Sequence, residues 1–195
     1  MDNVEPLLLD LPAQLLTPRL SLAPPAPGDG AMLNRAIVES FAELHEWMPW
    51  AATQPTVIES ERFVRDAAGR YLRREDLPLF MRLRDGGEFI GATGIHRIDW
   101  SVPRFEIGYW CHTSHVGRGY VSESVTAITR FVFETLHAAR VEIRTDLNNS
   151  RSFRIAEQLG FTLEGVLRRG SRTPQGELRD TRVYAMTEIS QLRGR

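Results

Sequence analysis

The segment from Phe105 to Ser124 constrains this chain most, because it joins an expected strand to an expected helix through a loop with two glycines. The strand is predicted over residues 104–110, and the helix opens at Val121. Gly117 and Gly119 let the backbone between them turn tightly and approach a ligand closely. The first turn of a helix presents free N–H groups and the positive end of its dipole. The segment therefore predicts an anion site, and a phosphate-bearing cofactor is the expected ligand.

Two familiar phosphate loops do not match these residues. A Walker loop needs a lysine, and all 24 basic residues of the chain are arginines. A dinucleotide-binding fingerprint needs a third glycine where the helix opens, and Ser122 lies there instead. The remaining Gly-x-Gly turn is weak evidence alone, since such turns often only connect two elements.

The residues after this helix add a second signal. Residues 141–145 alternate as a strand does, and the polar turn 146–152 follows. Phe153, Ala156 and Leu159 have helical spacing, and Gly160 is typical of a helix end. The order is therefore strand, glycine loop, helix, strand, polar turn and short helix.

With these segments in this order, the chain resembles the GNAT superfamily of acetyl-CoA-dependent N-acetyltransferases, and within it the RimJ/RimL type that acetylates protein N-termini. The resemblance runs over residues 16–189. It is carried by the opening strand 16–20, the central strand 106–110, the pyrophosphate loop 116–121, and the cofactor-flanking pair 149–152 and 159–161. The loop departs from the family pattern at both ends, where Val116 and Val121 lie.

The periodicity along the chain predicts one α+β domain with a mixed, mostly antiparallel sheet of about seven strands and about four flanking helices. We expect residues 1–15 to form an apolar N-terminal arm and residues 16–190 to form the acetyltransferase domain. The resemblance further implies that the strand 105–110 splays away from the strand 141–145. Its freed backbone groups then pair with the pantetheine arm of the cofactor.

The resemblance implies acetyl-CoA as the cosubstrate, with no metal. Backbone amides do most of the phosphate binding in such a loop, so we expect binding to survive the two valines. The expected cofactor-binding residues are Tyr109, Trp110, Cys111, Val116, Gly117, Arg118, Gly119, Tyr120, Val121, Ser122, Asn149 and Ser152.

Acyl transfer to an amine needs a base for the amine and an acid for the departing thiolate. Glu106, on the cleft side of its strand, is the first candidate for the base. The alternatives are His96, His112 and His115.

The resemblance makes Ser152 the acid, with Tyr184 as a weaker alternative. The glutamate proposed as base in RimL-like enzymes is replaced by Ser171. Trp47, Trp50 and Phe41 are expected on the acceptor side.

Bulk composition narrows the partners. The formal net charge of −1 gives no general reason to expect nucleic acid or an anionic membrane. No stretch approaches the ~20 apolar residues of a membrane span. Cys111 is the only cysteine, which excludes an internal disulfide and fits a reducing cytoplasm.

The predicted function is direct acetyl transfer in a ternary complex to a primary amine, preferably a protein N-terminal α-amine of the ribosomal-protein type. A small-molecule amine such as an antibiotic, polyamine or amino acid is the alternative acceptor. A catalytically weak acyl-CoA-binding regulatory module is the alternative from another class. A covalent route through Cys111 is less favoured, because we expect this residue beyond the strand end. A homodimer is expected from the resemblance.

Overall fold

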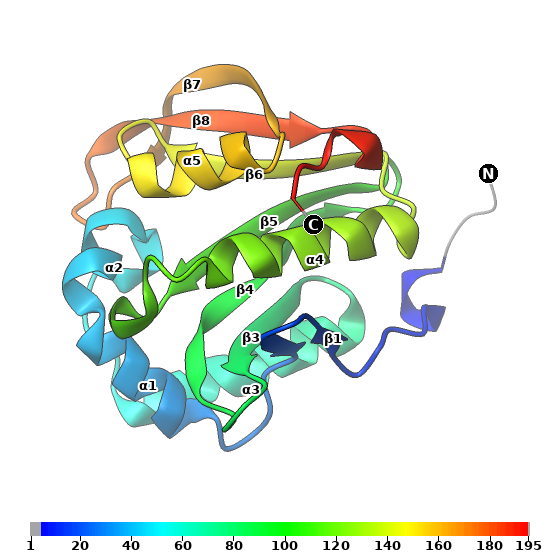
Figure 1. Ribbon diagram of the computed structural model, residues 1–195. Coiled ribbons are helices and arrows are strands. Elements are labelled where there is room, and N and C mark those ends of the chain that lie inside the picture. The colour runs from blue at the N-terminus through cyan, green and yellow to red at the C-terminus, as the bar shows by residue number, and fades with distance from the viewer. Residues whose placement is uncertain (1–4, 195) are drawn as a thin grey trace.

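A strongly curved eight-stranded sheet forms the centre of residues 5–194, the part of the chain that this computed structural model describes (Figure 1). The strand order is β1-β2-β3-β4-β5-β6-β8-β7. The strands are β1 (Leu15–Leu16), β2 (Leu20–Ala23), β3 (Leu77–Leu83), β4 (Phe89–Asp99), β5 (Arg104–Cys111), β6 (Arg140–Asp146), β7 (Thr162–Arg172) and β8 (Leu178–Met186). All neighbours are antiparallel except β5 and β6, which are parallel.

Helices cover both faces of this sheet (Figure 1). One face carries α1 (Gly30–Glu39), α2 (Phe41–Trp47) and α3 (Val57–Arg73), and the other carries α4 (Tyr120–Glu134) and α5 (Ser150–Gln158). Short 3-10 turns are η1 (Pro6–Leu8), η2 (Pro49–Ala51), η3 (Thr113–His115) and η4 (Ile189–Gln191).

Two apolar clusters match the two helical layers. The larger one joins Val125, Ile128 and Val132 of α4 to the inner side chains of β5 and β6. The smaller one joins α1 and α3 to Phe80 and Phe89. Their side chains recur at helical spacing in the sequence, and burying these stripes attaches the helices to the sheet.

The parallel pair β5–β6 separates soon after it begins. Residues 104–106 of β5 pair with residues 140–142 of β6, and no later register pair joins the two strands in the described residues. β5 nevertheless continues to Cys111, and its residues 106–111 all pair with β4 on the other side. The predicted splay is therefore present, and it leaves backbone groups of residues 107–111 without a strand partner on one edge.

The opening segment differs from the prediction of one strand over residues 16–20. The Thr17 amide donates to the Leu20 carbonyl at 2.9 Å, so the chain turns there and makes two strands, β1 and β2. Pro18 favours this turn because it cannot extend a ladder with an N–H. This adds the eighth strand. A helix beyond the four predicted, α2, contains Phe41 and Trp47 and makes five α-helices in the described part of the chain.

The expected N-terminal arm lies on the body of the protein from residue 5 onward. Leu9 and Leu11 pack against the main cluster, and the Arg74 guanidinium donates to the Leu9 carbonyl at 2.8 Å. Leu15 pairs within the sheet, so the expected boundary at residue 15 falls inside β1. Residues 1–4 lie outside the described range. None of the helices in residues 5–194 is long and apolar enough to cross a membrane.

Gly160 ends α5 and leads into β7, as the sequence predicted. Its φ is +91°, and a Cβ there would lie 2.1 Å from the Gln191 carbonyl oxygen. We expect Gly160→Ala to lower the free energy of unfolding by about 2–4 kcal/mol, because left-handed strain and a backbone clash add together. Urea unfolding measures this. Gly176→Ala is the matched control, since Gly176 has φ +88° and open space around it. Equal losses in both variants would contradict the clash.

Candidate functional site

The loop before α4 has the backbone geometry predicted for an anion cradle. Gly117 and Gly119 have φ values of +77° and +79°, which are left-handed conformations that glycine adopts readily. Within residues 5–194, no hydrogen bond takes the amides of residues 117–122 as donors. Six successive N–H groups are therefore free at the positive end of a fifteen-residue helix. This donor set fits a pyrophosphate.

Arg19 contacts this loop, although it is not among the site residues predicted from the sequence. Its guanidinium stacks on the Tyr120 ring at 4.5 Å, donates to the Arg118 carbonyl at 2.9 Å and pairs with Glu123 at 2.6 Å. It also lies 3.5 Å from where a Gly119 side chain would begin. Arg19 comes from the turn between β1 and β2, about a hundred residues away, so local pattern carries no signal for it.

The other predicted loop residues divide between surface and core. Val116 is exposed, whereas Val121 packs against the main apolar cluster. The Arg118 side chain donates to the Ser114 carbonyl at 3.1 Å. Ser122 lies in the first turn of α4, and its carbonyl accepts from Thr126. The donors of this loop are backbone amides, so the side chains of Val116 and Val121 replace none of them.

Tyr109 and Ser152 join the splayed strand to α5. The Tyr109 hydroxyl donates to the Ser152 carbonyl, and the Ser152 hydroxyl donates to the Tyr109 oxygen, both at 3.1 Å. Burial raises the pKa of the Tyr109 phenol to about 12. Asn149 caps α5, since its side-chain oxygen accepts from the Ser152 amide at 3.1 Å. Asn149 is thus the N-cap of α5, while its cofactor-binding role and the acid role of Ser152 stay predictions.

A cavity of about 570 Å³ lies on the face of the sheet that carries α1 and α3, opposite α4 and α5. It reaches the splayed strand β5. Its walls are mostly apolar and aromatic, and its floor includes Gly108, Tyr109 and Trp110 of β5. The other lining residues are Leu33, Ile37, Met48, Trp50, Thr53, Pro55, Glu59, Ser60, Phe63, Arg70, Pro78, Phe80, Ala92, Thr93 and His96. The rim residues Trp50 and Phe63 are 52% and 48% exposed, so the cavity opens to solvent.

Of the three aromatic residues expected on the acceptor side, one lines this cavity. Trp50 does so and lies 6.2 Å from the Trp110 ring. Trp47 instead borders a separate hollow beside residues 148–151, and Phe41 stacks on His45. The cause is the break between α2 and η2, which turns Trp47 and Trp50 in different directions.

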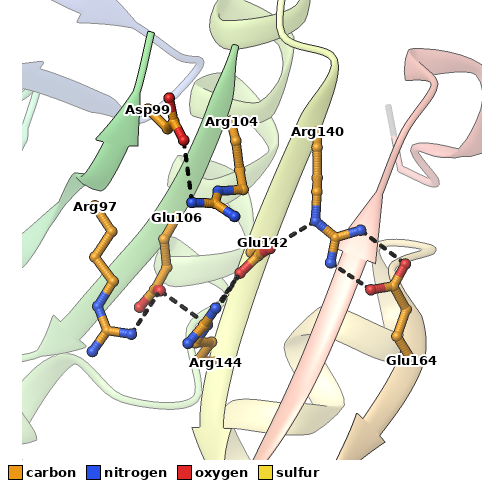
Figure 2. A network of polar contacts seen from close by, with 8 residues as sticks. All are labelled: Arg97, Asp99, Arg104, Glu106, Arg140, Glu142, Arg144 and Glu164. Carbon is orange, nitrogen blue, oxygen red and sulfur yellow. Dashed lines mark hydrogen bonds and ion pairs between the residues drawn. The ribbon is translucent and has the colours of Figure 1, made fainter. Parts of the chain in front are cut away.

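Glu106 lies at the point where β5 and β6 diverge, within a network of charged side chains (Figure 2). Its Oε2 atom is 3.2 Å from Arg144 Nε and 3.6 Å from Arg97 Nη1. Arg144 also binds Glu142, which Arg140 holds at 2.6 Å from the other side. Burial is the main cause that raises the pKa of Glu106, and the two arginines oppose it.

Glu106 is not among the residues that line the cavity. Gly108 and Trp110, on the same face of β5, do line it. The carboxylate is engaged with cations from both neighbouring strands. The role of Glu106 as the base remains a prediction.

The remaining acid–base candidates differ in whether they line the cavity. His112 binds Glu39 at 2.8 Å, and His115 is buried beside Glu88 and Tyr120, so both belong to the loop. The buried Tyr184 hydroxyl donates to Glu157 at 2.8 Å. Among the three histidines considered, His96 alone lines the cavity.

Cys111 corrects one expectation, because it is the last residue of β5 and pairs with Gly91 rather than lying beyond the strand. Burial raises the pKa of its thiol to about 11, with Arg118 opposing this weakly. A thiol of this kind carries little thiolate at neutral pH, so the burial of Cys111 disfavours a covalent acetyl-cysteine route.

Comparison with known proteins agrees with this arrangement. Residues 19–162 match the family model described as the acetyltransferase (GNAT) domain. The ribosomal-protein-serine acetyltransferase of Escherichia coli strain K12 is 29% identical over 125 residues, which is 63% of this chain and 69% of that protein. The chain spans between 58% and 70% of the length of the first three curated relatives that it matches.

Solved structures share the fold at low identity. RimL, a ribosomal α-N-protein acetyltransferase in complex with coenzyme A, has a TM-score of 0.84 and 20% identity, over 91% of this chain and 99% of that one. The microcin C7 self-immunity acetyltransferase MccE, in complex with acetyl-CoA and AMP, has a TM-score of 0.83 and 23% identity, over 88% and 94%.

Proposed function

The chain belongs to the GNAT acetyltransferase family, and within that family we propose that it moves the acetyl group of acetyl-CoA directly to a protein N-terminal α-amine. The observation that carries this proposal is the splayed strand β5, which lies between two different binding surfaces. The cradle of free amides lies at the N-terminus of α4, on one face of the sheet. The apolar cavity lies on the opposite face. Two substrates then meet at Gly108 without a covalent enzyme intermediate.

The peptide acceptor is supported by the shape and lining of the cavity. A volume of about 570 Å³ with a solvent-exposed aromatic rim admits the first residues of a chain end. The relationship to a ribosomal-protein-serine acetyltransferase supports the same acceptor. Small amines are the second candidate, because the apolar lining also suits a compact ring compound and MccE is a structural neighbour. A cytoplasmic location is also part of the proposal, based on the single cysteine, as is a homodimer, based on the family resemblance.

Cofactor binding is tested first, by thermal unfolding with acetyl-CoA, CoA, ATP and NAD in parallel. A ligand at ~100 times its dissociation constant adds about 2.7 kcal/mol, which raises the midpoint by roughly 5–11 °C for a chain of this size. We expect this shift with both CoA species and not with ATP or NAD. A missing CoA shift would contradict the loop assignment.

The acceptor is tested next with acetyl-CoA and three hexapeptides, followed by mass spectrometry. One has a free N-terminal serine, the second is the same peptide with a blocked N-terminus, and the third is blocked but contains a lysine. We expect acetylation of the first peptide only. Transfer to the lysine, or faster transfer to phenylalaninamide or spermidine than to the peptide, would overturn the proposed acceptor class.

A further inference from the structure

His96 stands directly against the backbone at which the two substrates would meet. It lies in β4 and lines the cavity, with its side chain 38% exposed. A Cβ built on Gly108 would be 3.0 Å from His96 Cδ2 and 3.3 Å from Nε2. The imidazole therefore covers Gly108, and the missing side chain at that position makes room for it.

Asp76 faces this ring from the other side. Its Oδ1 atom is 3.6 Å from His96 Nδ1, and Arg70 binds its second oxygen. Burial alone would raise the pKa of Asp76, but contacts with His96 and Arg70 outweigh it and lower the pKa. Asp76 is therefore a carboxylate that faces Nδ1, which leaves Nε2 directed at Gly108.

The sheet register explains why these two residues meet. Leu77 in β3 pairs with Ile95 in β4, so the preceding residue, Asp76, comes opposite His96. His96 is in turn the cross-strand partner of Glu106. The charged groups that face the imidazole are thus Asp76 before β3, Arg70 from α3 and Glu106 from β5.

We propose that His96 is the base that accepts the proton of the acceptor amine, with Asp76 as its positioning residue. This proposal rests on the acetyltransferase function proposed above and names its proton acceptor. An acceptor amine arrives as an ammonium group and must become neutral before it can attack. Neutral His96 Nε2 takes one proton from it, while Asp76 holds the N–H on Nδ1.

The acetyl transfer then conserves atoms and charge. The amine nitrogen forms a bond to the acetyl carbon, the carbon–sulfur bond breaks, and the sulfur leaves with the bonding electron pair. The second amine proton ends on that sulfur, and His96 releases the first to solvent. The products are the acetylated amine, the thiol and one proton.

His96→Asn tests this, because asparagine keeps a short donor toward Asp76 but has no proton acceptor in place of Nε2. His137→Asn is the matched control, since His137 is exposed at the end of α4 and its φ of +53° suits asparagine. We expect His96→Asn to lower kcat for the serine peptide by about 100-fold or more, with unchanged KM for acetyl-CoA. The control should match the wild type.

Two further readouts separate proton acceptance from structure. Hydroxylamine is largely uncharged at pH 7.5, so it needs no base to become a nucleophile, and its acetylation should fall less than about tenfold in His96→Asn. We expect the kcat of the wild type to decline at acidic pH, and we expect this decline to be absent in His96→Asn. Asp76→Asn should lower kcat by about tenfold without raising KM.

Several outcomes would overturn the proposal. One is an equal loss for peptide and hydroxylamine in His96→Asn, which would indicate a structural role. Another is unchanged peptide turnover in His96→Asn together with a loss of tenfold or more in Glu106→Gln, which would return the base role to Glu106. If the wild type acetylates phenylalaninamide but not the peptide, the acceptor class fails while the same comparison on phenylalaninamide still tests His96.

Discussion

Gly119→Glu is expected to weaken CoA binding by at least ~100-fold, as measured by isothermal titration. The substitution places a carboxylate among the free amides of the cradle, where the pyrophosphate is expected. Like charges about 4 Å apart repel by about 1 kcal/mol in water and about 4 kcal/mol near a protein surface, so a loss of this size follows. Arg19 would also be drawn to the new carboxylate, which removes a cation from the site.

Two controls separate this repulsion from the cost of the backbone conformation. Gly119→Gln has a similar size and strain without the charge, and it should lose much less affinity. Gly86→Glu, at φ +82° in the hairpin between β3 and β4, has the same backbone cost at a distance from the site and should bind CoA like the wild type. Unaltered CoA affinity in Gly119→Glu would contradict the assignment of the loop.

Arg144→Met is expected to lower the free energy of unfolding by about 2–3 kcal/mol at pH 8. Arg144 is 29% exposed and is shared by Glu106 and Glu142, which are 17% and 6% exposed (Figure 2). Without the Arg144 guanidinium, Glu106 retains only its 3.6 Å ion pair with Arg97, and Glu142 retains its ion pair with Arg140. The two carboxylates then repel each other at the point where β5 and β6 separate.

The loss should depend on pH in a defined direction. The pKa of Glu106 is already raised, mainly by burial, and removing Arg144 raises it further. A raised carboxyl contributes stability below its unfolded pKa of about 4.3, and this contribution is lost as pH rises through the folded pKa. The defect of Arg144→Met should therefore shrink as the pH is lowered from 8 toward 5.

Glu142 behaves in the opposite sense. Burial raises its pKa, but hydrogen bonds from Arg140 and Arg144 outweigh this and lower it. Its stabilising contribution is present above the unfolded pKa and is lost as pH falls through the folded value. It therefore changes little between pH 8 and pH 5, and Glu106 dominates the trend in that window.

Urea unfolding at pH 8 and pH 5 measures both effects. Arg104→Met is the control from the same network, because its pair with Asp99 is 3.4 Å long and solvent-exposed, and its loss should be undetectable. Adding Glu106→Gln to Arg144→Met should recover part of the stability at pH 8. A pH-independent defect with no recovery would show that Arg144 contributes packing rather than charge.

Local sequence patterns were sufficient to predict the strand, the loop and the helices of this site. The alternation in residues 105–110, the two glycines and the apolar spacing in α4 and α5 each depend on neighbours within a few turns, so the strand, loop and helices were predicted within a few residues of their bounds. The same local rules identified the helix end at Gly160, whereas the cap at Asn149 became visible only in the structure. The family resemblance, rather than periodicity, supplied the splay between β5 and β6.

Which side chains meet depends on long-range contacts that local patterns do not specify. Asp76 reaches His96 through the register of β3 on β4, Arg19 reaches the loop from the first hairpin, and Glu106 meets cations from β4 and β6. Each contact depends on the pairing of strands that are distant in sequence or on a turn that packs against another element. A strand's own pattern specifies which face a residue occupies but not what lies across from it. The residues that could move protons were therefore visible in the sequence, while their partners came from the fold.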